Sequence, residues 1–196
     1  MRLKQHLNEL ASDFGKGITF IDIDETIFHT FAKIKVFKDG KLKRELDNQE
    51  FNTYELQPGE SFDFGEFRSA DLFARTSIPI PETVKRIQRM FKNIDRRDSR
   101  VVLLTARANF DNRDEFLQVF RKNGIPIDRI YVERAGEQLV GTLAQTKAAI
   151  INKYLKTGEY RRVRLIDDDL KNVKTFLEME KKIDPKIIEK IKRSTR

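Results

Sequence analysis

The sequence predicts an α/β fold in which a parallel sheet lies between two layers of helices. Short aliphatic runs alternate with longer amphipathic segments along most of the chain, which is typical of strand–helix units. The aliphatic runs lack polar alternation, as expected of strands covered on both faces. The stretch 27–80 breaks this rhythm and is too long for an ordinary connection. We therefore expect a core formed by residues 1–26 and 81–196, with residues 27–80 inserted as a small cap.

The N-terminal elements are predicted from periodicity. Leucines at helical spacing predict a helix over residues 1–13, and the apolar run 17–23 predicts the first strand. Alternation around the turn dipeptide Asp39-Gly40 predicts a hairpin over residues 33–46, whose lysines we expect to face an anion. The rest of the insertion is rich in phenylalanine, which favours a small core over a base-stacking surface. These phenylalanines are Phe51, Phe62, Phe64, Phe67 and Phe73.

The elements after the insertion follow a regular strand–helix alternation. Pro81 begins a helix whose apolar residues share one face, and Gly124 and Gly158 end two later helices. The three further strands are aliphatic and short. The expected helices cover residues 81–94, 111–124, 142–158 and 170–182, and the expected strands cover residues 100–105, 128–133 and 162–169.

Composition excludes several classes of protein. The 196 residues include no cysteine and two histidines, which excludes a disulfide scaffold and argues against a histidine-rich zinc site. No signal peptide or membrane span is evident, so we expect a cytoplasmic protein without membrane partners. The net charge of +8 favours acidic partners, although solvated helix faces explain much of it.

Polar residues cluster where the predicted strands end. Asp22, Asp24 and Thr26 follow the first strand, Thr105 and Arg107 follow the second, and Asp167, Asp168 and Asp169 follow the last. Because ligands bind at the carboxyl ends of parallel strands, these groups are expected to converge. Clustered carboxylates repel one another unless a hard cation such as Mg²⁺ lies among them. Helix capping is the alternative role, but it explains only one of the acidic sites.

Lys147 is expected on the inner face of the helix 142–158. It lies about 40° from Leu143 around the helix axis, within the apolar stripe. A lysine there either extends its amine to solvent or meets an anion. Its place near the start of the helix suits an approach to the carboxylates.

These motifs together resemble those of the haloacid dehalogenase superfamily of phosphatases and phosphotransferases, which have a Rossmann-like core. "DIDET" is similar to the first motif, "VVLLTAR" to the second and "VRLIDDD" to the fourth, while Lys147 suits the third. The resemblance spans residues 17 to about 180. This chain has Glu25 where many relatives have glycine. Its triple aspartate leaves the metal ligand open among Asp167, Asp168 and Asp169; we favour Asp168 and then Asp167, because the pair directly after the strand is the usual site.

The resemblance implies a role for each residue. Asp22 is the nucleophile that forms an aspartyl-phosphate, and Asp24 is the general acid and base. Thr105 and Lys147 contact the phosphoryl group. The Mg²⁺ ligands come from Asp22, the backbone carbonyl of Asp24, and Asp167 or Asp168. Thr26 and Arg107 are candidate substrate-binding residues, Thr26 through support of its loop and Arg107 either through a phosphate or by pairing with an acid.

The function expected from the sequence is hydrolysis of phosphate monoesters. The partner is a phosphorylated small molecule or a nucleic-acid end, and protein partners are not indicated. A nucleotidase or a polynucleotide 3′-phosphatase fits the basic and aromatic insertion. The alternatives are a phosphotransferase, a sugar-phosphate phosphatase, and a nucleic-acid-binding module without activity. The chain lacks a P-loop motif, so no ATP-driven kinase half is expected.

Overall fold

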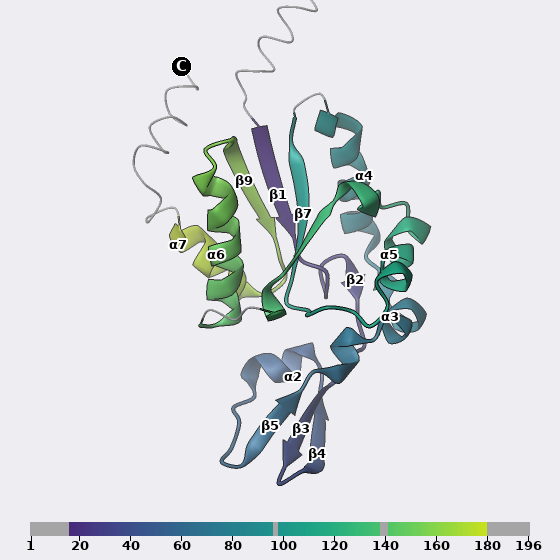
Figure 1. Ribbon diagram of the computed structural model, residues 1–196, viewed down its shortest axis with the longest axis vertical. Helices are drawn as coiled ribbons and strands as arrows, with labels where there is room; N and C mark the ends of the chain where they lie inside the picture. The colour runs from purple at the N-terminus through teal and green to yellow at the C-terminus, as the bar shows by residue number, and fades with distance from the viewer. Residues whose placement is uncertain (1–15, 96–97, 138–140, 180–196) are drawn as a thin grey trace, which may run out of the picture.

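The structure is a computed structural model that describes residues 16–95, 98–137 and 141–179. The helix expected over residues 1–13 lies outside the described residues. The main sheet has four parallel strands in the order β8-β7-β1-β9, and helices cover both of its faces (Figure 1). These strands are β1 (Lys16–Ile21), β7 (Arg100–Thr105), β8 (Tyr131–Arg134) and β9 (Tyr160–Ile166). The predicted three-layer α/β fold is confirmed.

Two pairs of helices enclose this sheet. Phe20 of β1 faces α6 (Leu143–Lys156) and α7 (Leu170–Met179), whereas the next residue, Ile21, faces α4 (Pro81–Ile94) and α5 (Arg113–Lys122). This alternation is the two-residue period of a strand buried on both faces. No helix in the described part of the chain is both long and apolar enough to cross a membrane.

Local sequence signals fix where the helices begin. Pro81 occupies the first turn of α4, where its missing N–H costs no hydrogen bond. Thr142 caps α6 in a reciprocal capping box with Gln145, and the Asn112 side chain caps α5. These caps explain why the predicted and observed helices agree closely.

The strand ends differ from prediction by a few residues. The strand expected over residues 128–133 begins only at Tyr131, because Ile127–Arg129 form a 3-10 turn, η3. The last strand ends at Ile166, so all three aspartates lie beyond it. β1 likewise ends at Ile21, which places Asp22 just past the strand.

The inserted segment contains a second, antiparallel sheet that Figure 1 shows beyond the carboxyl ends of the main sheet. The predicted hairpin is confirmed, and both Asp39 and Gly40 have positive φ, at 50° and 75°, as a tight two-residue turn requires. The strands of this small sheet lie in the order β4-β3-β5. The elements of this part of the insertion are β3 (Ile34–Lys38), β4 (Lys41–Leu46), α2 (Asn48–Thr53), β5 (Glu60–Asp63) and η1 (Gly65–Arg68).

The apolar residues of the insertion divide between two cores. Phe51, Phe62 and Phe67 pack around Ile34 and Val36 in a small core of the second sheet, as the sequence predicts. Phe73 of α3 (Ala70–Thr76) instead packs in the main core. Ile27 and Phe28 also pack in the main core. Phe28 belongs to β2 (Phe28–His29), which pairs with β6 (Ile78–Pro79). The division of the chain into core and cap at residues 27 and 80 stays a prediction.

Candidate active site

The tips of β1 and β9 bring Asp22 and Asp167 together. Ile21 pairs with Ile166 at the last matched position of these neighbouring strands, and the Asp22 amide donates a hydrogen bond to the Ile166 carbonyl at 2.9 Å. The next residue of each strand is therefore an aspartate at the same edge of the sheet. Convergence of the two acidic motifs follows directly from the parallel register.

Lys147 joins these two carboxylates. Its ammonium Nζ donates to Asp22 Oδ1 and to Asp167 Oδ2, both at 2.8 Å. The lysine is 3% exposed, so this is a buried ion triad and its amine does not extend to solvent. The inner-face position predicted for Lys147 is confirmed, and its partners are the predicted acids.

Asp168 completes a cluster of three carboxylates. One oxygen from each of Asp22, Asp167 and Asp168 lies within 4.8 Å of the other two. Thr26 Oγ1 donates to Asp168 Oδ1 at 3.2 Å, so Thr26 orients an acid of the cluster. Both candidates for the fourth-motif ligand therefore belong to the cluster.

Asp169 has the helix-capping role that was the alternative for this acidic run. Its carbonyl accepts from the Val173 amide and its side chain accepts from the Lys171 amide, at the start of α7. Asp167 is held in place by two further donors, the Asp169 amide at 3.0 Å and the Asn172 side chain at 2.9 Å. One of the three consecutive aspartates thus caps a helix, and two remain for a ligand.

The charges in this cluster do not balance. Burial raises the pKa of Asp22 well above its usual range, and Lys147 only partly opposes this. Burial acts to lower the pKa of Lys147, but Asp22 and Asp167 outweigh it and raise that pKa. Burial and the neighbouring Asp167 also raise the pKa of Asp168. When all three carboxylates are ionised, the single ammonium leaves two uncompensated negative charges, which is the charge that one divalent cation neutralises.

The residues present fit Mg²⁺. The cluster offers only oxygen ligands, which this hard cation prefers. In addition, the Oδ1 atom of Asn172 is buried and has no hydrogen-bond partner among the described residues. Such an orphaned acceptor beside Asp167 suits a metal-bound water. Asp24 adds no side-chain oxygen to the cluster, and the expected contribution of its carbonyl stays a prediction.

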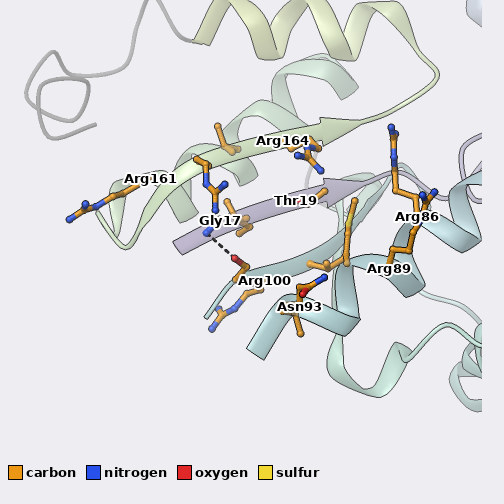
Figure 2. A pocket seen from close by; sticks show the side chains of 15 residues that line it. Gly17, Thr19, Arg86, Arg89, Asn93, Arg100, Arg161 and Arg164 are labelled. Carbon is orange, nitrogen blue, oxygen red and sulfur yellow. Dashed lines mark hydrogen bonds between the residues drawn. The ribbon is translucent and has the colours of Figure 1, made fainter. Parts of the chain in front are cut away.

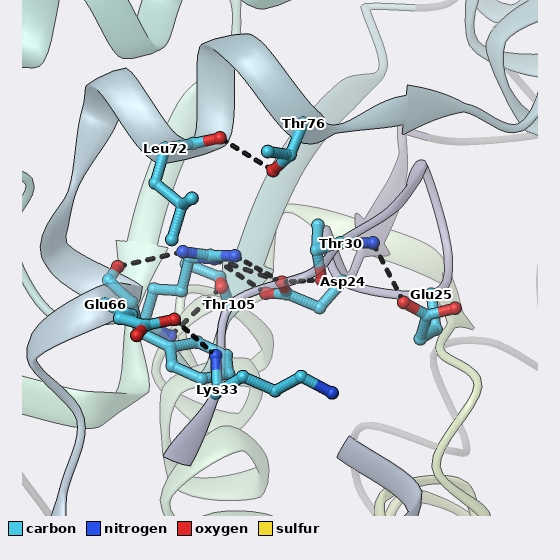
Figure 3. Close-up of polar contacts among 10 residues, drawn as sticks. Asp24, Glu25, Thr30, Lys33, Glu66, Leu72, Thr76 and Thr105 are labelled. Atoms are coloured by element: carbon cyan, nitrogen blue, oxygen red, sulfur yellow. Dashed lines mark hydrogen bonds and ion pairs between the residues drawn. The ribbon is translucent and has the colours of Figure 1, made fainter. Parts of the chain in front are cut away.

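Asp24 forms a separate ion pair with Arg107. The Arg107 guanidinium donates to Asp24 from Nε at 2.9 Å and from Nη2 at 2.7 Å, and the Thr30 hydroxyl donates to Asp24 at 2.7 Å (Figure 3). Arg107 is 2% exposed and lies over the ring of Phe67 at 4.7 Å. Of the two roles weighed for Arg107, the structure shows the pairing with an acid.

Arg107 also ties the active-site loops to the insertion. Its Nη1 donates to the carbonyl of Phe67 at 2.9 Å. Nearby, the Asp111 side chain accepts from the amide of Ala70, and its own amide donates to the carbonyl of Arg68. The loop after β7 therefore holds the segment that follows the small sheet against the edge that carries the carboxylate cluster.

Thr105 and Glu25 complete the loops around the site. Thr105 is fully buried at the end of β7, and its hydroxyl accepts from the Arg107 amide at 3.1 Å, which leaves its own proton free to donate. Glu25 has a left-handed φ of 53°. Its side chain accepts from the Thr30 amide at 3.0 Å, which offsets part of that conformational cost.

A cavity of about 430 Å³ connects this polar floor to the insertion. Its floor includes Asp22, Asp24, Arg107, Lys147, Asp167, Asp168 and Asp169, but neither Thr105 nor Thr26. The residues of the insertion that line it are mostly apolar, with two polar exceptions, Asn48 and Arg68. The apolar ones are Ile34, Phe51, Phe64 and Phe67, and Leu143 of α6 also lines the cavity.

The expectation for the basic hairpin was wrong. Its lysines do not line the cavity; Lys35 pairs with Glu66 and Lys43 pairs with Glu60. The hairpin points away because its inner face supplies Ile34 and Val36 to the small core. Asn172 and Arg68 also line the cavity, although neither was predicted as a site residue. The spacing of Asn172, five residues after Asp167 on the next helix, is the only signal that pointed to it.

Comparisons with family profiles, with curated proteins and with solved structures find no match.

Proposed function

We propose that this chain is a Mg²⁺-dependent phosphohydrolase that works through a phosphorylated Asp22. The observation that supports it best is the cluster in which one ammonium and three carboxylates meet at the edge of a cavity. This is the arrangement that the motif resemblance implies. A bound Mg²⁺, held by Asp22, Asp168 and Asp167, supplies charge neutralisation that lets an anionic carboxylate approach an anionic phosphate.

The first step uses Asp22 as the nucleophile. Lys147 occupies one carboxylate oxygen, Oδ1, whereas Oδ2 accepts no hydrogen bond from the described residues and lies at the cavity. Attack of Oδ2 on phosphorus breaks the ester bond to the leaving oxygen and leaves an acyl phosphate on Asp22. Lys147 has a third N–H beyond its two carboxylate bonds, and it is free to hold the transferring phosphoryl group.

The second step needs water and a base. Water attacks the phosphorus of the acyl phosphate, the bond to Asp22 breaks, and inorganic phosphate leaves. Asp24 lines the same cavity and is the proposed base, and it is the proposed acid for the leaving oxygen in the first step. While it is ion-paired with Arg107 it has no proton to donate, so acid catalysis requires Asp24 to release Arg107.

The cavity supports a mononucleotide as substrate. Its volume of about 430 Å³ lies within the range of small-molecule sites, and its aromatic wall suits a planar base. A nucleic-acid end and a sugar phosphate are the other substrates to compare. An intracellular location, expected from the cysteine-free sequence, is part of the same proposal.

Transfer of the phosphoryl group to another acceptor is the second candidate. The apolar wall of Ile34, Phe51 and Phe67 limits water near the site, which favours an organic acceptor. Product analysis with nucleoside and sugar acceptors separates transfer from hydrolysis.

The deciding experiment is hydrolysis of p-nitrophenyl phosphate with and without Mg²⁺. We expect Mg²⁺-dependent turnover that Asp22→Asn reduces by at least about 10³-fold while the unfolding temperature stays close to that of the wild type. The matched control is Asp169→Asn, which changes the capping aspartate of the same acidic run and should keep most of the activity. Full activity in Asp22→Asn would exclude Asp22 as the nucleophile.

A further inference from the structure

A second cavity, of about 820 Å³, lies at the end of the main sheet away from Asp22. It is open between α4 and the first halves of β1, β7 and β9, and Figure 2 shows its side chains. We call it the arginine groove. Six arginines line it: Arg86, Arg89, Arg100, Arg161, Arg162 and Arg164.

The arginines come from opposite walls of the groove. Arg86 and Arg89 lie one helical turn apart on α4, and Arg162 and Arg164 lie two residues apart on β9 and so on one face of that strand. The floor between them is uncharged and includes Gly17, whose Cα lies beside the Arg162 guanidinium; a Cβ built on Gly17 would lie 3.8 Å from Arg162 Nη2. Figure 2 shows Arg86 and Arg89 on one side and Arg164 on the other.

The described residues that line the groove include no aspartate or glutamate. All six of its arginines are exposed. Arg89 donates to a carbonyl of its own helix, and Arg100 stacks over the ring of Tyr131 at 5.1 Å. Neither contact neutralises charge. A bound polyanion relieves the repulsion among these guanidinium groups.

The residue types favour phosphate over other anions and surfaces. All six basic residues are arginine and none is lysine, and the planar guanidinium matches phosphate oxygens in a two-pronged contact. No aromatic side chain lines the groove, so it offers no stacking surface for bases. None of the exposed large hydrophobic residues lies in it, which argues against insertion into lipid.

We propose that the arginine groove binds the phosphodiester backbone of a nucleic-acid strand without reading its sequence. This site is separate from the cavity at Asp22 and contains no carboxylate for catalysis, so its role is binding. It would hold nucleic acid at the amino ends of the strands while the catalytic edge stays open to substrate. The net charge of +8 is consistent with this affinity.

The test is fluorescence anisotropy with a labelled oligothymidine that has hydroxyl groups at both ends. This probe carries no phosphate monoester, so binding is measured independently of the proposed phosphatase activity. If four to six phosphates contact arginines, the logarithm of the binding constant should fall with the logarithm of salt concentration with a slope of about −3 to −4. Binding with no salt dependence would overturn the proposal.

Variants of each wall make the test specific. Arg86→Ala with Arg89→Ala removes the pair on α4, and Arg162→Ala with Arg164→Ala removes the pair on β9. Each double variant should weaken binding by about tenfold and reduce the slope by about 1.4, since each removes two contacts. Lys85→Ala with Lys92→Ala removes the same charge from another side of α4 and should change binding little. Equal weakening by the lysine pair would overturn the proposal.

Two more readouts separate the alternatives. Polyglutamate of equal charge should compete poorly; if it competes as well as the oligonucleotide, the groove is a site for acidic protein segments and the proposal fails. The groove variants should keep the wild-type rate on p-nitrophenyl phosphate and the wild-type unfolding temperature. If the wild-type protein binds the probe but hydrolyses no phosphate monoester, the proposed phosphatase function fails and the proposed binding site in the arginine groove stands.

Discussion

Replacement of Lys147 by methionine tests the energetics of the carboxylate cluster. The change shortens the unbranched side chain by one heavy atom and removes its charge, which leaves the buried carboxylates of Asp22 and Asp167 without their shared donor. Each charge-assisted hydrogen bond contributes about 1.5–3 kcal/mol, and loss of one partner of a buried ion pair costs about 3–5 kcal/mol. We therefore expect the free energy of unfolding to fall by about 3–5 kcal/mol without metal. For a chain of this size the unfolding temperature should drop by about 6–20 °C.

Mg²⁺ should reverse part of this loss. Without the ammonium, the three carboxylates carry one more uncompensated charge, so the cation should stabilise Lys147→Met more than the wild type. The assay is urea unfolding with and without Mg²⁺. Lys153→Met, an exposed position on the same helix, is the matched control and should unfold like the wild type. If the free energy of unfolding of Lys147→Met lies within about 1 kcal/mol of that of the wild type, Lys147 does not hold the cluster together as described. Equal stabilisation of both proteins by Mg²⁺ would also contradict the role given to the uncompensated charge.

Three further predictions concern positions around the site and in the small sheet. Arg107→Lys should lower the free energy of unfolding by about 2–3 kcal/mol in urea titrations, because lysine cannot make the two-pronged contact with Asp24, whereas exposed Arg113→Lys should have no effect. Gly136→Ala should lower the free energy of unfolding by about 1–3 kcal/mol, since a Cβ there would lie 2.1 Å from the Ala106 carbonyl oxygen. The control is Gly65→Ala, whose added Cβ meets only the Asp63 side chain. Equal stability of the two variants would argue against the close approach at Gly136. Hydrogen bonds from Lys43, the Gln57 amide and Tyr54 lower the pKa of Glu60 to about 2, so its stabilising contribution should be present above about pH 4.5 and be lost as the pH falls towards 2. The stability difference between the wild type and Glu60→Gln should shrink over that interval in urea titrations, and a constant difference would contradict the shift.

The meeting of the acidic motifs was predictable because parallel strands align their ends. Once residues 17–23 and 162–169 are recognised as buried strands, Asp22 and Asp167 must follow them at one edge if the strands are neighbours. Helical periodicity alone placed Lys147 on the inner face of its helix. These inferences needed only local patterns and a general rule of sheet geometry.

Contacts that depend on the path of the insertion were not predictable. Arg107 pairs with Asp24 and also reaches the Phe67 carbonyl, across 83 and 40 residues of sequence. No local sequence pattern predicts how the inserted segment 27–80 returns to the core. For the same reason the lysines of the hairpin were wrongly expected near the anion. The direction of a hairpin is set by the residues that its sheet buries, here Ile34 and Val36.

The most direct measurement of the central claim is anomalous X-ray scattering from crystals soaked with Mn²⁺, as a substitute for Mg²⁺, and a phosphate mimic. We expect one strong anomalous peak between the carboxylates of Asp22 and Asp168, with the mimic beside it in the cavity and within reach of Lys147. Crystals that show the mimic or the ion bound elsewhere, with Lys147 still bridging Asp22 and Asp167 alone, would contradict it.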